Sequence, residues 1–385
     1  MEIYIKYMSN IYELLESDDE LGKELEIISP KSRTKYAYVF LVMKGNDYIP
    51  GLISAVESLR QTNNIYDIVC LYTKDVTDSD ILNKVCDYTK LVDYIKFSTK
   101  PLLLNKQNKL YSCWNDISYT KCQALSLIEY EKVLFMDCDM VVLKNIDHLF
   151  ELNCPAATFS NPWSERYKTE EFKEKEKKQN VKKVFYDPFN VCYTGDKIYR
   201  DDIEEAMHNE GHLFIASLML LKPSIDDLNQ IKNIIAVNQP FGFNNFSTAE
   251  EQIISLYYST YKNVPFEHIH QKYNFIVNKP NWLNDKKNNI PYVLHYACRT
   301  KPWLKSKLWF RTPYSVDNIW WYYFYKSCIN NNIKNITFPN SKYIFNILYN
   351  KDKKHSFYIK YTSSDDKYYP WLKDIKLKQF NKFIN

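Results

Sequence analysis

The N-terminal half of the chain alternates short apolar runs with apolar residues at helical spacing. Residues 36–43, YAYVFLVM, are rich in strand formers, which predicts a buried strand. Leu52, Val56 and Leu59 recur on one helix face, which predicts a helix over 52–61 packed on a sheet. Further strands are predicted at 68–72, 91–97, 132–136 and 214–221, and helices at 78–88 and 119–129. A capping box, S-x-x-E at 247–250, predicts the start of another helix that runs through Tyr258. This order is typical of an α/β fold with a parallel sheet between two helical layers.

Three stretches stand outside this pattern. Residues 1–34 are a polar lead-in with one predicted short helix at 11–16. Residues 164–183 carry the densest run of charges and have no apolar face, so we expect a solvated helix or lid there. The C-terminal part is aromatic and rich in lysine. The expected divisions are a lead-in (1–34), one α/β domain (35–310) with an insertion at about 160–212, and a C-terminal extension (311–385).

The composition excludes several classes of protein. Of the 385 residues, 45% are hydrophobic and 25% are charged, which is ordinary for a globular domain and excludes a disordered chain or a coiled-coil rod. A net charge of +5 is too small to indicate nucleic-acid binding. The 6 glycines form neither of the glycine-rich phosphate-binding motifs, which argues against dinucleotide-binding and P-loop folds. The 33 tyrosines, with abundant Lys, Asn and Ile, are typical of an AT-rich genome such as that of a large DNA virus.

The cysteines and the apolar runs favour an intracellular protein. The 9 cysteines include no C-x-x-C pair, which favours reduced thiols over disulfides or a zinc site. The acidic start lacks the apolar run of a signal peptide, and no apolar stretch approaches the ~20 residues of a membrane span. We therefore expect a soluble, cytoplasmic protein without a membrane span, located in the host cytoplasm or the virion if the source is viral.

The most distinctive polar motif is D-C-D at 137–139, directly after the apolar strand predicted at 132–136. Residues two apart in an extended segment point the same way, so the carboxylates of Asp137 and Asp139 converge. Two close carboxylates favour a cation between them, and hard oxygen ligands suit Mg²⁺ or Mn²⁺. The alternative is a pair of loop acids that merely end a strand.

Further candidate residues are scattered along the chain. His295 follows an apolar pair and could be a third metal ligand, and Lys301, which precedes a proline, could neutralise a phosphate. Glu251 and Gln252 lie in the first turn of a predicted helix, where an acid ordinarily just complements the helix dipole. Tyr48, in the loop after the first strand, could stack on a base. The plainer alternatives are a half-buried histidine at a strand end and a surface tyrosine.

Five segments, taken in order, resemble one family. They lie at 39–59, 119–150, 214–224, 250–255 and 293–303, and include the runs L-F-M-D-C-D-M-V-V-L and H-Y-A-C-R-T-K-P-W. They resemble the glycogenin-like glycosyltransferases of family eight, which are retaining enzymes with a single GT-A domain, a Rossmann-like α/β fold with a mostly parallel sheet flanked by helices. The resemblance implies a metal-dependent enzyme that moves a hexose, expected to be glucose, from a UDP-sugar to a glycan or protein acceptor.

The resemblance also implies a role for each candidate residue. Asp137, Asp139 and His295 would hold Mn²⁺, with Mg²⁺ as the alternative, against the diphosphate of the UDP-sugar. Tyr48 would stack on uracil, and Lys301 would contact the β-phosphate of the leaving group. Lys121 would touch the diphosphate or the sugar, and Glu251 and Gln252 would lie at the sugar and its anomeric carbon. The other donor-binding positions would be Val42, Cys138, Ala216, Ser217 and Cys298.

The chain departs from the family pattern at several positions. The family motif N-[SA]-G-V is replaced by I-A-S-L at 215–218, the family's D-Q by Glu251-Gln252, and a loop glycine by Cys298. These changes leave the donor sugar open. We expect the insertion at about 160–212 on the acceptor side. No tyrosine occurs at 274–291, the stretch that corresponds to the glycogenin acceptor, so we expect an external acceptor rather than self-modification.

Two other functions are weighed against this enzyme. One is a catalytically weak GT-A domain that binds a glycan or a protein, against which the intact D-C-D, His295 and Lys301 argue. The other is a nucleic-acid or membrane-surface binder that uses the lysines and aromatic residues at 351–383, although such a stretch is more often a solvated hairpin or helix. The expected partners are therefore the donor and the acceptor, without nucleic acid, and a homodimer is left open.

Overall fold

The computed structural model describes residues 32–97, 114–159, 194–204, 214–236, 250–277, 291–297, 301–304, 315–333, 335–337 and 344–346. The chain divides into two units, Met1–Arg33 and Thr34–Asn385, and the fold described below is that of the second. The predicted helices at 11–16 and 164–183, the stretch 351–383 and Cys298 lie outside the described residues.

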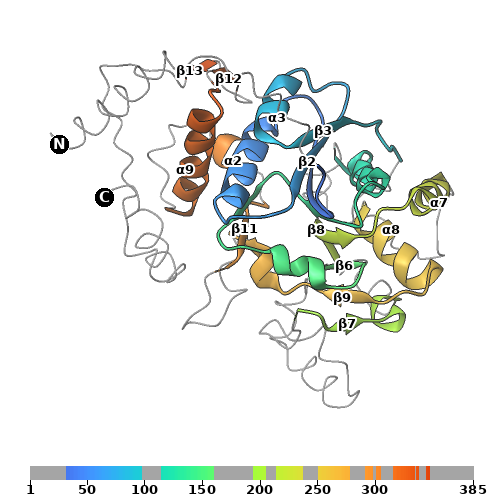
Figure 1. Ribbon diagram of the computed structural model, residues 1–385. Helices are drawn as coiled ribbons and strands as arrows, with labels where there is room; N and C mark the ends of the chain where they lie inside the picture. The colour runs from blue at the N-terminus through green and yellow to red at the C-terminus, as the bar shows by residue number, and fades with distance from the viewer. Residues whose placement is uncertain are drawn as a thin grey trace, which may run out of the picture. The chain divides into compact units, whose positions relative to one another are not determined.

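An eight-stranded sheet forms the centre of the fold, in the order β3-β2-β1-β4-β8-β6-β9-β7 (Figure 1). Strands β8 and β7 are antiparallel to their neighbours, and the other six run in one direction. The α/β class with a mostly parallel sheet is therefore confirmed. The strands are β1 (Tyr36–Val42), β2 (Asp67–Tyr72), β3 (Tyr88–Leu91), β4 (Lys132–Met136), β6 (Ala156–Phe159), β7 (Lys197–Ile198), β8 (Phe214–Leu221) and β9 (Phe266–His268).

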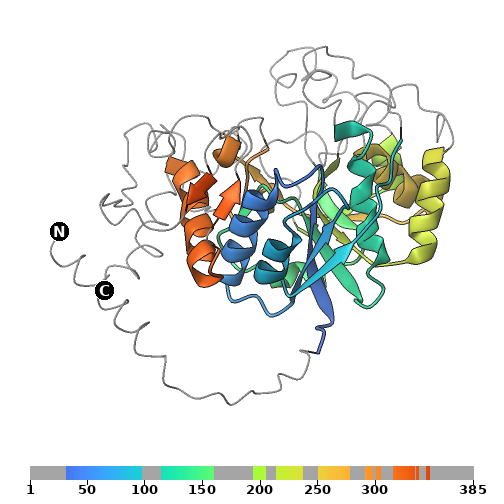
Figure 2. The same cartoon turned by 90° about the horizontal axis from the view of Figure 1, so that it is seen from above.

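Helical layers cover both faces of this sheet (Figure 2). Successive side chains of a strand point to opposite faces, so Tyr38 and Phe40 of β1 join one hydrophobic core and Val39 and Leu41 join the other. The first core contains α2 (Ile49–Arg60), α3 (Ser79–Val85) and α9 (Ser315–Asn330). The second contains a 3₁₀ helix (Ser118–Ser126), α7 (Ile225–Ala236) and α8 (Glu250–Leu256), which continues as a π-helical turn (Tyr257–Tyr261).

Two predicted elements differ from the observed ones for a shared reason. The third strand ends at Leu91 instead of reaching residue 97, and the expected α-helix over 119–129 is a shorter 3₁₀ helix. The side chain of Gln123 donates to the carbonyl oxygen of Asp93 at 2.9 Å, and the Thr120 hydroxyl accepts from the backbone N–H of Ile95 at 3.1 Å. Side chains of the 3₁₀ helix thus take the backbone groups that a longer strand would have offered to a neighbour.

A second, three-stranded sheet has the order β10-β11-β5, with β10 (Phe275–Ile276), β11 (Val293–His295) and β5 (Met140–Val142). Because β5 follows β4 after only three residues, this small sheet begins where the large sheet ends. The remaining elements are a hairpin of β12 (Asn335–Thr337) and β13 (Ile344–Asn346), and short 3₁₀ helices at Asp147–Glu151, Gln271–Tyr273 and Pro302–Leu304.

Helix α9 packs on α2 through an aromatic face. The rings of Trp320 and Phe324 stack with centroids 5.2 Å apart, and the Ser54 hydroxyl of α2 donates to the Trp320 carbonyl oxygen at 2.9 Å. This part of the 311–385 stretch therefore belongs to the same core as the first strands. None of the helices in the described ranges has the length and apolarity of a membrane span. The cysteines that the structure describes are free: Cys70, Cys86, Cys122, Cys138, Cys154 and Cys328.

Candidate active site

The D-C-D segment is the connection between the two sheets. The backbone N–H of Asp137 donates to the carbonyl oxygen of Ser217 on β8 at 2.9 Å. The carbonyl oxygen of Asp139 accepts from the N–H of Tyr296 at 2.9 Å. Between them, the buried thiol of Cys138 donates to the Leu41 carbonyl oxygen of β1 at 3.3 Å. Each residue of the motif is thus held by a different strand or segment. These contacts do not use the carboxylates of Asp137 and Asp139, which can therefore point to the same side.

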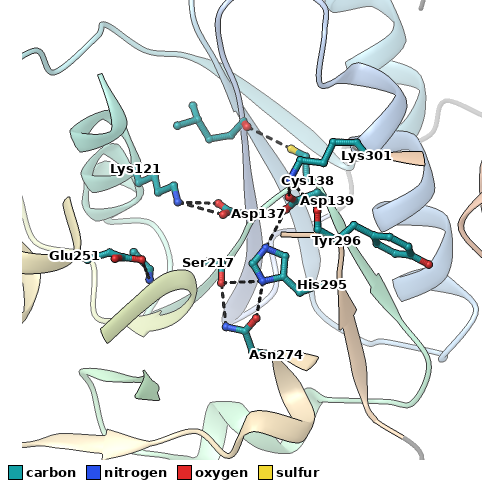
Figure 3. Close-up of polar contacts among 12 residues, drawn as sticks. Lys121, Asp137, Cys138, Asp139, Ser217, Glu251, Asn274, His295, Tyr296 and Lys301 are labelled. Atoms are coloured by element: carbon teal, nitrogen blue, oxygen red, sulfur yellow. Dashed lines mark hydrogen bonds and ion pairs between the residues drawn. The ribbon is translucent and has the colours of Figure 1, made fainter. Parts of the chain in front are cut away.

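His295 reaches the aspartates through the small sheet. Strand β11 is antiparallel to β5, and His295 pairs with Met140, the residue after Asp139. The His295 Nε2 lies 3.4 Å from the Asp139 Oδ1 (Figure 3). One ligand atom from each of Asp137, Asp139 and His295 lies within 4.8 Å of the other two, so the three residues form one cluster.

Asn274 and Ser217 support the far side of the His295 ring. The His295 Nδ1 lies 2.8 Å from the Asn274 Oδ1, and the Asn274 amide N–H donates to the Ser217 hydroxyl at 2.9 Å. Asn274 is completely buried at the end of the short 3₁₀ helix that precedes β10. The Ser217 side chain, which we expected at the donor sugar, therefore contacts the groups behind the histidine.

A lysine lies beside each aspartate, on opposite sides of the pair in Figure 3. Lys301 pairs with the Asp139 Oδ2 and also donates to the Tyr296 carbonyl oxygen at 2.8 Å. Lys121 lies between two acids, with its Nζ 3.0 Å from the Asp137 Oδ1 and 2.9 Å from the Glu250 Oε1. The cluster thus combines acidic ligands with two positive charges that could meet phosphate oxygens.

The surroundings of the two aspartates shift their pKa values in opposite directions. Burial alone would raise the pKa of Asp139, but the Lys301 ammonium group holds it far below its ordinary value. The pKa of Asp137 is raised, because burial and the neighbouring Asp139 charge outweigh the opposing effect of Lys121. Burial alone would lower the pKa of Lys121, but its two carboxylate partners raise it above the ordinary value. Asp139 is therefore ionised at any physiological pH.

The cluster fits a divalent cation. The Asp139 Oδ1 is buried and has no hydrogen-bond partner, which is costly for a carboxylate oxygen unless a cation satisfies it. Two carboxylates and one imidazole form a ligand set that suits Mn²⁺, and Mg²⁺ would accept the oxygen ligands. The residues predicted as metal ligands are thus brought together by the fold.

The start of α8 contributes a second acidic group. The Glu251 Oε1 accepts from the backbone N–H of Ala216 at 3.2 Å, which places this carboxyl group one residue from Ser217. Burial, and then the charge of Glu250, raise the pKa of Glu251 to about 8. Gln252 is completely buried within α8. The Glu250 and Glu251 carboxyl groups of α8 thus both contact residues of this region.

Aromatic rings gather around Tyr48. The half-buried Tyr48 ring makes edge contacts with Trp114 and Trp303, with centroids 5.2 and 5.7 Å away. The indole N–H of Trp303 donates to the carbonyl oxygen of Asp47 at 2.9 Å. Val42, expected at the donor, is the completely buried last residue of β1. Trp114, Glu250 and Asn274 are site residues that the sequence motifs did not single out.

The site can now be compared with known proteins. The family model described as "Glycosyl transferase family 8" matches residues 39–209. Over these residues the chain is similar to glycosyltransferase family 8. This similarity agrees with the resemblance found in the motifs.

Several curated proteins resemble this chain. It is 28% identical to "Uncharacterized protein R707" of Acanthamoeba polyphaga mimivirus, over 70% of this chain and 83% of that protein. It is 24% identical to galactinol synthase 2 of Solanum lycopersicum, over 73% of this chain and 76% of that protein. A shorter match, 29% identical over 36% of this chain and 22% of the other, is to UDP-glucuronate:xylan alpha-glucuronosyltransferase 2 of Arabidopsis thaliana.

Solved glycosyltransferase structures also resemble it. GlyE of Streptococcus pneumoniae TIGR4 aligns with a TM-score of 0.45 at 16% identity, over 78% of this chain, and the chain spans 63% of that protein. An active-site mutant of LgtC aligns with a TM-score of 0.43 at 14% identity, over 70% of this chain and 90% of that one.

Proposed function

We propose that this chain is a retaining, metal-dependent glycosyltransferase that moves a neutral hexose, with glucose as the expected sugar, from a UDP-sugar to a glycan or protein acceptor. The observation that carries the proposal is the convergence of Asp137, Asp139 and His295, with a lysine beside each carboxylate. When bound, a divalent cation such as Mn²⁺ would stabilise the charge that develops on the diphosphate. This is the chemistry that cleavage of a nucleotide sugar requires.

The arrangement of the side chains supports one orientation of the donor. Tyr48 contacts Trp303, which follows Lys301 by two residues, so the aromatic rings lie on the Asp139 side of the cluster. Lys121 lies on the Asp137 side. A donor with uracil against Tyr48 and its diphosphate at the aspartates would extend its sugar toward Lys121. In that orientation, the Lys301 ammonium group is the one that neutralises the β-phosphate as the C1–O bond breaks.

The charges on the sugar side favour a neutral sugar. Lys121 is already paired with Asp137 and Glu250, and Glu251 adds a third carboxyl group next to them. The hydroxyl groups of a hexose can donate to such carboxylates, whereas the carboxylate of a hexuronic acid would be repelled. Galactinol synthases and a glucuronosyltransferase both occur among the relatives, and this charge balance favours a donor of the uncharged class.

Retention at C1 is the stereochemistry that the family resemblance implies. A retaining transfer proceeds either through a covalent intermediate or by attack on the same face from which UDP leaves. We assign Glu251 to the sugar side, where Asp137 and Glu250 pair with Lys121 and Glu251 accepts from a backbone N–H. Glu251 is therefore the residue to replace in tests of a covalent route. The product of an α-linked donor would be α-linked in both cases.

A donor panel tests the proposal. Purified protein is incubated with Mn²⁺ and with UDP-glucose, UDP-galactose or UDP-glucuronate, and released UDP and intact protein mass are measured. We expect UDP release from a neutral donor, its loss in Asp139→Asn, and release from UDP-glucuronate at least about tenfold slower. A UDP–Mn²⁺ complex that binds without any donor cleavage would favour the weak, glycan-binding alternative. A ladder of hexose additions on the protein would overturn the external acceptor.

A further inference from the structure

We propose that Asn274 is a positioning residue that holds His295 in the tautomer required of a metal ligand, with the proton on Nδ1 and the lone pair of Nε2 directed at the aspartates. The inference rests on the proposed metal-dependent function. It assigns a role to a residue that neither the motifs nor the comparisons single out, and it concerns a group that lies behind the ligand and does not touch the cation.

The first step is the hydrogen bonding of the Asn274 amide. Its N–H group donates to the Ser217 hydroxyl at 2.9 Å, which turns its Oδ1 toward the His295 Nδ1 at 2.8 Å. A carbonyl oxygen can only accept, so the proton of this bond belongs to Nδ1. The neutral ring then carries its lone pair on Nε2, the atom that lies 3.4 Å from the Asp139 Oδ1.

The second step is the consequence of the opposite tautomer. A proton on Nε2 would point at the Asp139 carboxylate and would use the lone pair that a cation needs. The cluster would then offer two ligands instead of three. Hydrogen bonds made to the far nitrogen of a metal-binding histidine generally fix the orientation of its ring and raise the basicity of the ligand.

The third step is the rigidity of the arrangement. Asn274 directly precedes β10, which lies beside the strand of His295, since Ile276 pairs with His295 and the Val277 N–H donates to the His295 carbonyl oxygen at 3.0 Å. Ser217 is fixed on β8, where its carbonyl oxygen accepts from the Asp137 N–H at 2.9 Å. The Asn274 amide therefore connects the strand of the histidine to the strand that holds an aspartate.

A matched pair of variants separates this role from a purely structural one. Asn274→Asp keeps an acceptor for the Nδ1 proton, whereas Asn274→Leu keeps the approximate volume and removes it. We expect Mn²⁺ binding in the presence of UDP, followed by electron paramagnetic resonance, to weaken on the order of 10–100-fold in Asn274→Leu. Asn274→Asp should recover most of that affinity. Asn330→Leu, which changes an exposed asparagine on α9, should bind as the wild type does.

A second measurement reads the tautomer itself. In ¹⁵N-histidine-labelled protein without metal, the Nδ1 of His295 should carry a proton in the wild type, and Asn274→Leu should populate the form that is protonated on Nε2 alone. Equal Mn²⁺ affinity in the wild type and Asn274→Leu, or no recovery in a folded Asn274→Asp, would overturn the inference. A wild type that binds no Mn²⁺ with UDP would refute the proposed function, and the NMR comparison would still decide the role of Asn274. If Asn274→Leu does not fold, Ser217→Ala, which removes the partner of the amide N–H, is expected to mix the two tautomers.

Discussion

Gly51 of α2 lies directly against the backbone of Cys138 in the D-C-D segment. A Cβ at this position would lie 2.7 Å from the Cys138 carbonyl oxygen and 2.8 Å from the ring of Trp303. The absence of a side chain therefore lets the first turn of α2 approach the metal-binding segment and the aromatic residue beside Lys301. The glycine is a requirement of close packing here, because its backbone is helical.

Gly51→Ala tests this contact. Alanine ordinarily stabilises a helix relative to glycine, by about 1 kcal/mol. Here we expect a net loss of about 1–3 kcal/mol, since the backbone of the D-C-D segment must shift to admit a methyl group. Thermal unfolding measures the stability, and UDP–Mn²⁺ binding measures the displacement of the ligands. A variant that is more stable than the wild type and binds UDP–Mn²⁺ equally well would show that the D-C-D segment can shift without a cost in stability or affinity.

The Asp139–Lys301 ion pair predicts a double-variant effect. Both side chains are buried, so Asp139→Ala leaves an uncompensated ammonium group and should cost about 3–5 kcal/mol of stability. Asp139→Ala combined with Lys301→Met should recover much of the stability but no activity. Chemical denaturation of the four proteins in the cycle gives the coupling energy, and additive losses would contradict the pairing.

The leaving-group role predicts a kinetic signature for Lys301. Lys301→Ala should lower turnover by a factor on the order of 10²–10³, as the loss of one charge-stabilising donor does in other enzymes. UDP affinity should fall much less, because the charge on the β-phosphate grows only as the C1–O bond breaks. Rates of donor cleavage and UDP titrations separate the two effects. Lys35→Ala, which removes an exposed lysine paired with Glu131, is the control.

The sequence predicted the parts of the site that depend on strand ends. Asp137 and Asp139 follow an apolar run, and His295 ends another, so their convergence could be anticipated from pattern and family resemblance. The Asn274–His295 contact could not, because it joins residues 21 positions apart through the register of two short strands. Periodicity carries no information about such a register.

The helical residues of α8 show a different limit. The family motif predicts Glu251 and Gln252 at the sugar, and the structure adds Glu250, which pairs with Lys121. Consecutive helical side chains are about 100° apart, so the motif alone could not predict that the preceding residue also reaches this region. The burial of α9 could not be predicted either, because the aromatic run at 320–325 has no polar positions that would distinguish a surface helix from a core helix.

The pKa of Glu251 predicts how stability depends on pH. Its folded-state pKa is raised from 4.5 to about 8 by burial and by the charge of Glu250. Below pH 4.5 the carboxyl group is protonated in both states and costs nothing. Between pH 4.5 and 8 the unfolded chain ionises while the folded protein retains the proton, so this group lowers stability progressively as the pH rises, and the loss is complete above pH 8.

Glu251→Gln, which cannot ionise, should therefore unfold at nearly the same temperature as the wild type near pH 4.5 and at a higher temperature at pH 8. Melting curves of both proteins across this range measure the difference, in which the titration of all other groups largely cancels. Glu131→Gln removes a carboxylate whose side chain is 65% exposed and controls for the loss of one negative charge. A Glu251→Gln advantage that is constant with pH, or that shrinks as the pH rises, would mean that Glu251 is ionised in the folded protein at neutral pH and that the sugar side carries one more full negative charge.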